Sequence, residues 1–314
     1  MIKIKRRPKS GIRSMKTKKR RRLKYIAILP SLVTLMNGLC GFTAIIFASR
    51  GVGTVWSPQF LPRVNVTFFA MSGYMIFLGM IADMLDGHVA RISDSTSGFG
   101  AQLDSLCDAI SFGAAPAFLM LKQVEIHYQG LQFENLQYSQ FVGRIVYLIA
   151  IIYAMCALIR LARFNVEKSD DDSSHLSFAG LPSPAAAGLI ISMIIFQQDF
   201  LPKIAGWLGS SYHSFELAVT CILPIITLMA GLLMVTRIPY PHVMNRLLRG
   251  KKSFTTFLLA VFTLLFVIWS IQVAMVLGFF IFMLFGLIRW PFIYRRTSTG
   301  TRGLARTSRE NSPT

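Results

Sequence analysis

The stretch DMLDGHVARISDSTSGFGAQLDSLCD, residues 83 to 108, sets four acidic side chains into two long apolar runs. The runs cover residues 67–91 and 98–121, and the acidic side chains are Asp83, Asp86, Asp104 and Asp108. About 20 apolar residues are enough for a helix to cross a bilayer. We therefore predict two consecutive transmembrane helices, joined by a short turn, with carboxylates on both.

The rest of the chain repeats this apolar pattern. With 53% hydrophobic and 15% charged residues among 314, and a mean hydropathy of +0.52, the chain has too little polar surface to cover a soluble core. The other predicted spans are residues 26–49, 142–165, 180–197, 217–236, 254–270 and 273–290. We predict an all-α polytopic membrane protein with about eight transmembrane helices.

Basic residues predict how the chain is oriented. The net charge is +19, and residues 1–24 alone hold 13 lysines and arginines. The connections after the second, fourth, sixth and eighth spans are also basic. We therefore expect a protein of the cell (inner) membrane with both termini in the cytosol. We expect a basic tail over 1–24, a core over 25–250, two additional helices over 251–294 and a basic tail over 295–314. The first tail lacks a platform for stacking bases, so we expect contact with membrane lipids and not with nucleic acid.

The four aspartates are the acidic residues, out of 14, that fall inside the predicted spans. Asp83 and Asp86 are three positions apart, and Asp104 and Asp108 are four apart, so each pair shares one helix face. Each carboxylate at that depth costs about 2.5–3.5 kcal/mol. Because the two helices run in opposite directions, both pairs meet at one depth, where Mg²⁺ or Mn²⁺ would neutralise them.

The residues between the pairs suggest a phosphate ligand. Gly87, Ala90 and Gly100 remove side-chain bulk, so that a bulky ligand could reach the backbone. Arg91 offers a fork of N–H donors to a phosphate, and His88 is expected to have a packing role. An ion channel or a divalent-cation transporter could also line its path with aspartates, but it would not require Ala90 and Arg91 at this spacing.

These positions resemble the signature of the CDP-alcohol phosphotransferase family, D-x-x-D-G-x-x-A-R-x(8)-G-x-x-x-D-x-x-x-D, with no departure at any specified position. The resemblance implies a six-helix core with a cytosolic active site. It implies that Asp83, Asp86, Asp104 and Asp108 hold two divalent cations and that Asp108 is also the catalytic base. It further implies that Asp86, Gly87, Ala90, Arg91 and Gly100 contact the CDP group.

Other segments resemble the phosphatidylserine synthase branch of that family. They are LPS with Thr34, Asn37 and Gly41 in the first span, SFGAAP at 111–116, RLARFN at 160–165 and GLPSPAAAG at 180–188. The residue after Pro30 is serine, where relatives often have asparagine. This likeness implies CDP-diacylglycerol and L-serine as substrates, with CMP released; choline or another alcohol is the alternative acceptor.

Four more polar residues are candidates for binding the acceptor or the lipid phosphate. Arg160 and Arg163 lie one helical turn apart at the cytosolic end of the fourth span, with Asn165 beside them. Both arginines could instead serve as ordinary cytosolic anchors. Asn37 is an amide inside an apolar span, where substrate contact and helix packing are equally expected. The sequence leaves a homodimer open.

Overall fold

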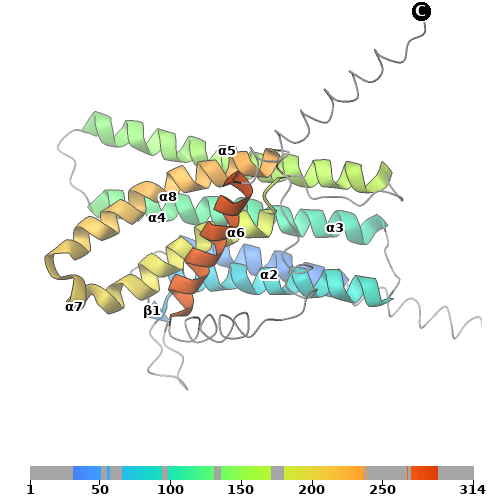
Figure 1. Ribbon diagram of the computed structural model, residues 1–314, viewed down its shortest axis with the longest axis horizontal. Coiled ribbons are helices and arrows are strands. Elements are labelled where there is room, and N and C mark those ends of the chain that lie inside the picture. The colour runs from blue at the N-terminus through green and yellow to red at the C-terminus, as the bar shows by residue number, and fades with distance from the viewer. Residues whose placement is uncertain are drawn as a thin grey trace, which may run out of the picture.

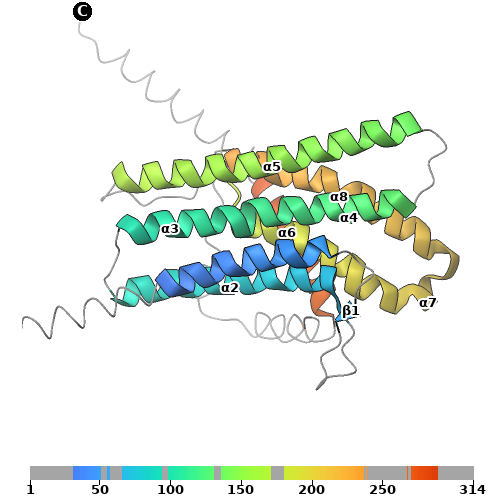
Figure 2. The same ribbon diagram turned by 180° about the vertical axis from the view of Figure 1, so that it is seen from behind.

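The computed structural model describes residues 31–50, 55–56, 66–93, 98–130, 136–170, 180–236, 238, 267 and 270–288. Apart from the two-residue antiparallel strands β1 (Val55–Trp56) and β2 (Val66–Thr67), its regular elements are helices. The long helices form one bundle and run roughly side by side (Figures 1 and 2). The predicted all-α membrane architecture is confirmed, whereas both basic tails lie outside the described residues.

The described helices correspond to predicted spans, although several of them are longer. In chain order they are Ser31–Ser49, α2 (Phe68–Ser93), α3 (Gly98–Asp108), the π-helix η1 (Ala109–Ala114), α4 (Ala115–Gly130), α5 (Leu136–Asp170), α6 (Ser183–Ile195), the π-helix η2 (Phe196–Phe200), the short helices η3 (Leu201–Ile204), α7 (Ala205–Leu208) and η4 (Gly209–Ser211), α8 (Tyr212–Val235) and Ile271–Ile288.

Six helical runs within the described ranges are long and apolar enough to cross a membrane. One of them, Ser183–Val235, doubles back through α7, so that α6 and α8 lie side by side and correspond to two predicted spans (Figure 1). The predicted span 254–270 lies outside the described residues except for positions 267 and 270. A total of eight spans therefore stays a prediction.

Several helices extend beyond the predicted spans and carry further acidic residues. Glu125 lies in α4, Asp199 in η2 and Glu216 in α8, outside the predicted spans but within helical runs that are long and apolar enough to cross a membrane. Two of the additional carboxylates are balanced by cations on the same stretch of helix. The Lys122 ammonium lies 2.8 Å from Glu125, and the Lys203 ammonium lies 3.0 Å from Asp199.

A polar cluster joins α4, η2 and α8 at the end of the bundle away from the aspartates. The His127 imidazole lies 3.1 Å from a Glu216 carboxylate oxygen, and Gln197 donates to the Thr220 hydroxyl at 2.7 Å. His127 follows Asp108 by 19 residues, which corresponds to roughly 28 Å along a helix. Hydrogen bonds within the cluster offset part of the cost of burying these side chains, and Gln197 Oε1 has no partner among the described residues.

Glycines allow the helix Ser31–Ser49 to pack closely on two neighbours. A Cβ atom at Gly41 would lie 2.4 Å from the Ser111 hydroxyl oxygen and 2.6 Å from the Ser111 Cα atom of η1. On α2, a Cβ atom at Gly79 would lie 3.0 Å from the Asn37 amide oxygen. The helix is thereby held against both segments that carry the aspartates (Figure 2).

The helix Ile271–Ile288 crosses the bundle obliquely and packs on α2 and α6 (Figure 1). The Phe279 ring stacks on Phe77 with a centroid distance of 6.0 Å, and it occupies the space that a Cβ atom at Gly188 would need. Near the start of this helix, Gln272 donates to Asp199 at 2.9 Å. It is thus attached to the core through an apolar contact and a polar one.

Replacement of Gly41 by alanine tests the close packing of the first helix. The added methyl group overlaps the backbone at Ser111, so we expect Gly41→Ala to lower the free energy of unfolding by about 1–3 kcal/mol. Gly143→Ala is the matched control, because a Cβ atom there meets no atom of the described residues within 4 Å. Alanine favours a helix over glycine by about 1 kcal/mol, so the control should be neutral or stabilising. Thermal unfolding in detergent compares the two, and equal melting temperatures would contradict the packing.

Candidate functional site

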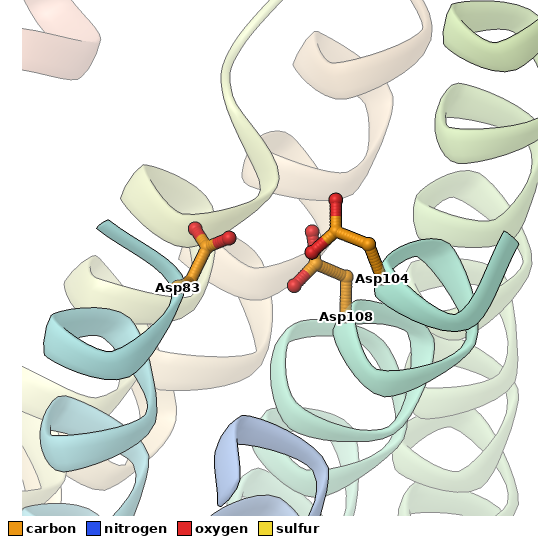
Figure 3. A group of neighbouring side chains, drawn as sticks. All are labelled: Asp83, Asp104 and Asp108. Atoms are coloured by element: carbon orange, nitrogen blue, oxygen red, sulfur yellow. The ribbon is translucent and has the colours of Figure 1, made fainter. Parts of the chain in front are cut away.

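Three aspartates from two helices meet near one end of the bundle. Asp83 comes from α2, and Asp104 and Asp108 come from α3. One carboxylate oxygen from each can be chosen so that all three lie within 4.8 Å of one another. Figure 3 shows Asp83 facing Asp104 and Asp108 across the space between the helices. This is the arrangement expected for a hairpin whose two carboxylate pairs meet at one depth.

Asp86 lies one helical turn beyond Asp83 and is held by a different neighbour. Its side chain is buried, and one carboxylate oxygen accepts a hydrogen bond from the Thr34 hydroxyl of the first helix. The other oxygen, Oδ1, has no hydrogen-bond partner among the described residues. A buried carboxylate oxygen in that condition is a free ligand for a cation.

Asn37 holds Asp108 in a similar way. It lies one turn after Thr34 and is fully buried, and its Nδ2 atom donates to Asp108 Oδ1 at 2.8 Å. The Ser111 hydroxyl donates to the backbone carbonyl of Asn37 at 2.8 Å. Asp108 and Ser111 therefore both contact Asn37, one through its side chain and the other through its backbone.

The segment after Asp108 is a π-helix, which the sequence analysis did not predict. In η1 the N–H of Ala115 bonds to the carbonyl of Ile110, and Tyr153 of α5 donates its hydroxyl to the carbonyl of Phe112 at 3.0 Å. Single π-helical turns within α-helices occur often at functional sites. Here the turn comes directly after the proposed base.

The two candidate arginines occupy different surroundings. Arg160 is buried on α5 and donates to the Ser183 hydroxyl at 2.7 Å, and it interacts electrostatically with Asp108. Its Nε atom has no hydrogen-bond partner among the described residues. Arg163 donates to the carbonyl of Val235 at 3.1 Å, which is the last residue of α8. Arg163 therefore caps a helix, whereas Arg160 lies within electrostatic reach of Asp108 and has an Nε donor without a partner among the described residues.

Asn165, the third candidate on α5, is paired with α3. Its Nδ2 atom donates to the Ser105 hydroxyl at 2.8 Å, and Ser105 lies next to Asp104 in the chain. This bond joins α3 to α5 one residue from the carboxylate cluster. It gives Asn165 a place at the edge of the site.

The positions expected to contact CDP lie on the same two helices. A Cβ atom at Gly87 would meet no atom of the described residues within 4 Å, so there is open space beside this position. Gly100 lies in the first turn of α3. Ala90 and Arg91 belong to the last turns of α2, but their side chains lie outside the described residues, as does that of His88.

Sequence reasoning did not recognise the first helix as a support for the aspartates. Thr34 had no assigned role, and Asn37 was considered for substrate contact or helix packing. The signal was present, because two polar side chains three positions apart lie on one face of an otherwise apolar helix. Their partners, Asp86 and Asp108, come from different segments, so only the packed bundle reveals the pairing.

The site suits divalent cations on structural grounds. Asp83, Asp104 and Asp108 present clustered oxygens, and Asp86 presents a buried oxygen without a partner among the described residues. Carboxylate oxygens are the ligands that Mg²⁺ and Mn²⁺ prefer. Arg160 adds a positive group at the edge of the cluster. Together these groups could bind a phosphate-bearing ligand through metal, and a carboxylate among them could accept a proton from a second substrate.

Comparison with known proteins agrees with this chemistry. A family model described as CDP-alcohol phosphatidyltransferase matches residues 27–222. The CDP-diacylglycerol–serine O-phosphatidyltransferase of Helicobacter pylori is 29% identical over 266 residues, which cover 85% of this chain and 92% of that protein. The proteins of the same name from Methanocaldococcus jannaschii and Saccharomyces cerevisiae are 33% and 36% identical. Those alignments cover 55% and 51% of this chain and 65% and 51% of the relatives.

The family model spans the helices that carry the motif and the site. It includes α2 and α3 with their four aspartates, the first helix with Thr34 and Asn37, and α5 with Arg160. Members of this family generally depend on a metal ion, which agrees with the acidic cluster. The chain belongs to the CDP-alcohol phosphatidyltransferase family.

Proposed function

We propose that the protein is a phosphatidylserine synthase, which transfers the phosphatidyl group of CDP-diacylglycerol to L-serine and releases CMP. The observation that carries this proposal is the convergence of Asp83, Asp104 and Asp108 within 4.8 Å, with Asp86 one turn away. The names of the similar proteins support serine as the acceptor. The basic residues of the sequence support a cytosolic location of the site and of both termini.

The four aspartates would hold two divalent cations, Mg²⁺ or Mn²⁺. When bound, the cations would neutralise the carboxylates and stabilise negative charge on the pyrophosphate of the donor. The open position at Gly87 leaves room for the CDP group, and Gly100 and Arg91 belong to the same motif. A core over 25–250 that contains all of these residues remains our proposed catalytic unit.

The chemistry requires a base and an in-line attack. Asp108 accepts the proton of the serine hydroxyl, whose oxygen then forms a bond to the phosphorus that carries diacylglycerol. The bond from this phosphorus to the oxygen of CMP breaks, and CMP leaves with the negative charge. Asp108 suits this role because Asn37 occupies only one of its two carboxylate oxygens.

Arg160 is our proposed partner for the carboxylate of serine. It is buried, lies within electrostatic reach of Asp108 and has an Nε donor without a partner among the described residues. Its Nη1 atom donates to the Ser183 hydroxyl, and this bond fixes the orientation of the guanidinium group. Arg163 is the weaker candidate, because it caps α8 at Val235.

An acceptor screen tests the proposed reaction. Purified enzyme with Mg²⁺ or Mn²⁺ should release CMP from CDP-diacylglycerol when L-serine is present, and chelation of the metal should stop the release. Choline, inositol and glycerol phosphate are the competing acceptors. Equal release with any of them would contradict serine as the acceptor. Metal flux into liposomes without CMP release would instead indicate a divalent-cation transporter.

Replacement of Asp108 tests its role as the base. Asp108→Asn keeps the shape of the side chain but cannot accept the proton, so we expect CMP release to fall by about 100-fold or more. Binding of the CDP-lipid should be partly retained. Asp199→Asn is the matched control, since Asp199 bonds Tyr74 and Gln272 at the other end of the bundle. An equal loss of turnover in both variants would point to a defect in folding.

Replacement of the two arginines tests which one recognises serine. Hydrogen bonds to charged groups contribute about 1.5–3 kcal/mol, so Arg160→Gln should raise the KM for serine by about 10- to 100-fold. The KM for CDP-diacylglycerol should change much less. Arg163→Gln is the matched control and should mainly lower the melting temperature, because it removes the bond to Val235. If Arg163→Gln alone raised the KM for serine, the assignment to Arg160 would be wrong.

A further inference from the structure

We propose that Asn37 is a positioning residue for Asp108, and that the π-helix η1 is the element that keeps Asn37 and Asp108 in register. This inference rests on the proposed function, because it assigns a role within the same site. It differs from the roles for Asn37 considered from the sequence, which were contact with a substrate and ordinary packing. Four structural observations support it.

The orientation of the Asn37 amide is set by its partner. A carboxylate oxygen can only accept a hydrogen bond, so the amide must present its Nδ2 group to Asp108, as the 2.8 Å contact shows. The amide oxygen then points away, and it has no hydrogen-bond partner among the described residues. Asp108 Oδ1 accepts this bond, and the remaining lone pairs of the carboxylate are available for a metal ion or for the proton of the acceptor.

The backbone of Asn37 is fixed from the same segment that carries Asp108. Ser111 of η1 donates its hydroxyl to the Asn37 carbonyl, and the glycine at position 41 lets this contact form. Asp108 and Ser111 are three residues apart, and they hydrogen-bond to the side chain and to the backbone carbonyl of Asn37, respectively. A side chain held at both its amide and its backbone has little freedom to rotate away from the carboxylate.

Tyr153 supports the π-helix from the opposite side. Its ring is fully buried, and its hydroxyl donates to the carbonyl of Phe112, which follows Ser111. On α8, a Cβ atom at Gly231 would lie 3.2 Å from the Tyr153 Cα atom, so the two helices pack closely at this point. This close packing on α8 fixes the backbone position of Tyr153, from which its hydroxyl bonds to η1.

Thr34 makes a similar hydrogen bond to the other pair of aspartates, Asp83 and Asp86. It lies one turn before Asn37 and donates to Asp86. One face of a single helix thus holds one carboxylate from α2 and one from α3. Side chains that orient metal ligands in this way commonly change metal affinity or activity by 10- to 100-fold when they are replaced.

Two measurements on Asn37→Ala test the inference. We expect kcat for CMP release to fall by about 10- to 100-fold with little change in the KM for serine, and the Mn²⁺ concentration for half-maximal activity to rise. The second readout does not depend on turnover: the increase in melting temperature on adding Mn²⁺ should require a higher concentration than in the unmodified protein. If the variant only lowered the melting temperature and left both metal readouts unchanged, Asn37 would be a structural residue and the inference would be wrong.

Two milder variants keep the test informative if Asn37→Ala does not fold. Ser111→Ala removes the hydrogen bond to the Asn37 carbonyl, and Tyr153→Phe removes only the hydroxyl that donates to the Phe112 carbonyl of η1. Each should reduce kcat by about three- to tenfold, in line with the loss of one hydrogen bond. Their matched controls are Ser72→Ala, whose hydroxyl bonds within α2, and Tyr147→Phe, an exposed tyrosine on α5. Equal effects in variants and controls would overturn the inference.

These measurements separate the inference from the proposed function. If the unmodified protein released no CMP with serine, the proposed function would fail. The Mn²⁺-dependent stabilisation could still be compared between Asn37→Ala and the unmodified protein. A normal response to Mn²⁺ in Asn37→Ala, with full CMP release from the unmodified enzyme, would overturn only the positioning role.

Discussion

Mutual repulsion of four aspartates inside an apolar bundle is the constraint on which the site depends. Three of the carboxylates approach within 4.8 Å, and like charges at such distances repel strongly when water is scarce. Burial adds the cost of removing each charge from water. Neighbouring polar groups and the cations of the proposed function would offset this cost. The structure shows the neighbouring groups that belong to the chain.

The first helix holds two of the four carboxylates, and these bonds set how closely that helix must approach. Thr34 and Asn37 are short side chains, so their hydrogen bonds to Asp86 and Asp108 require the helix backbone to lie near both α2 and the end of α3. Gly41 and Gly79 provide that proximity, since each leaves space that a larger residue would fill. The glycines and the hydrogen bonds are therefore two parts of one arrangement: small residues permit the approach that the short polar side chains need.

Much of this architecture could be predicted from the sequence, because long apolar runs and helical spacing are local properties. The membrane-spanning helices, the meeting of Asp83 with Asp104 and Asp108, and the family are confirmed. Some helices extend beyond the predicted spans, so Glu216 lies within α8 although the predicted span begins at residue 217. A hydropathy pattern ends where polarity rises, whereas a helix continues as long as its backbone bonds are formed.

The pairings within the site are harder to predict, because they depend on how distant segments pack. Asn37 and Asp108 are 71 residues apart in the sequence. Arg160 and Ser183 lie on different helices, so helical spacing does not predict the hydrogen bond between them. The π-helix after Asp108 likewise leaves no clear sequence signal. Family likeness marks the aspartates themselves but does not state which side chains hold them.

Two polar groups left without partners at the site support the proposed ligands. Among the described residues, Asp86 Oδ1 and Arg160 Nε are buried and unpaired, and the two groups carry opposite charges. If they served only the fold, they would be expected to pair with each other or with a nearby side chain, since an unpaired buried charge is costly. Instead Asp86 is held by Thr34 and Arg160 by Ser183, each with one polar atom to spare. A cation at the aspartates and an anionic group at Arg160 would satisfy both, which is the arrangement that our proposal requires for a metal-bound phosphate donor and a carboxylate-bearing acceptor.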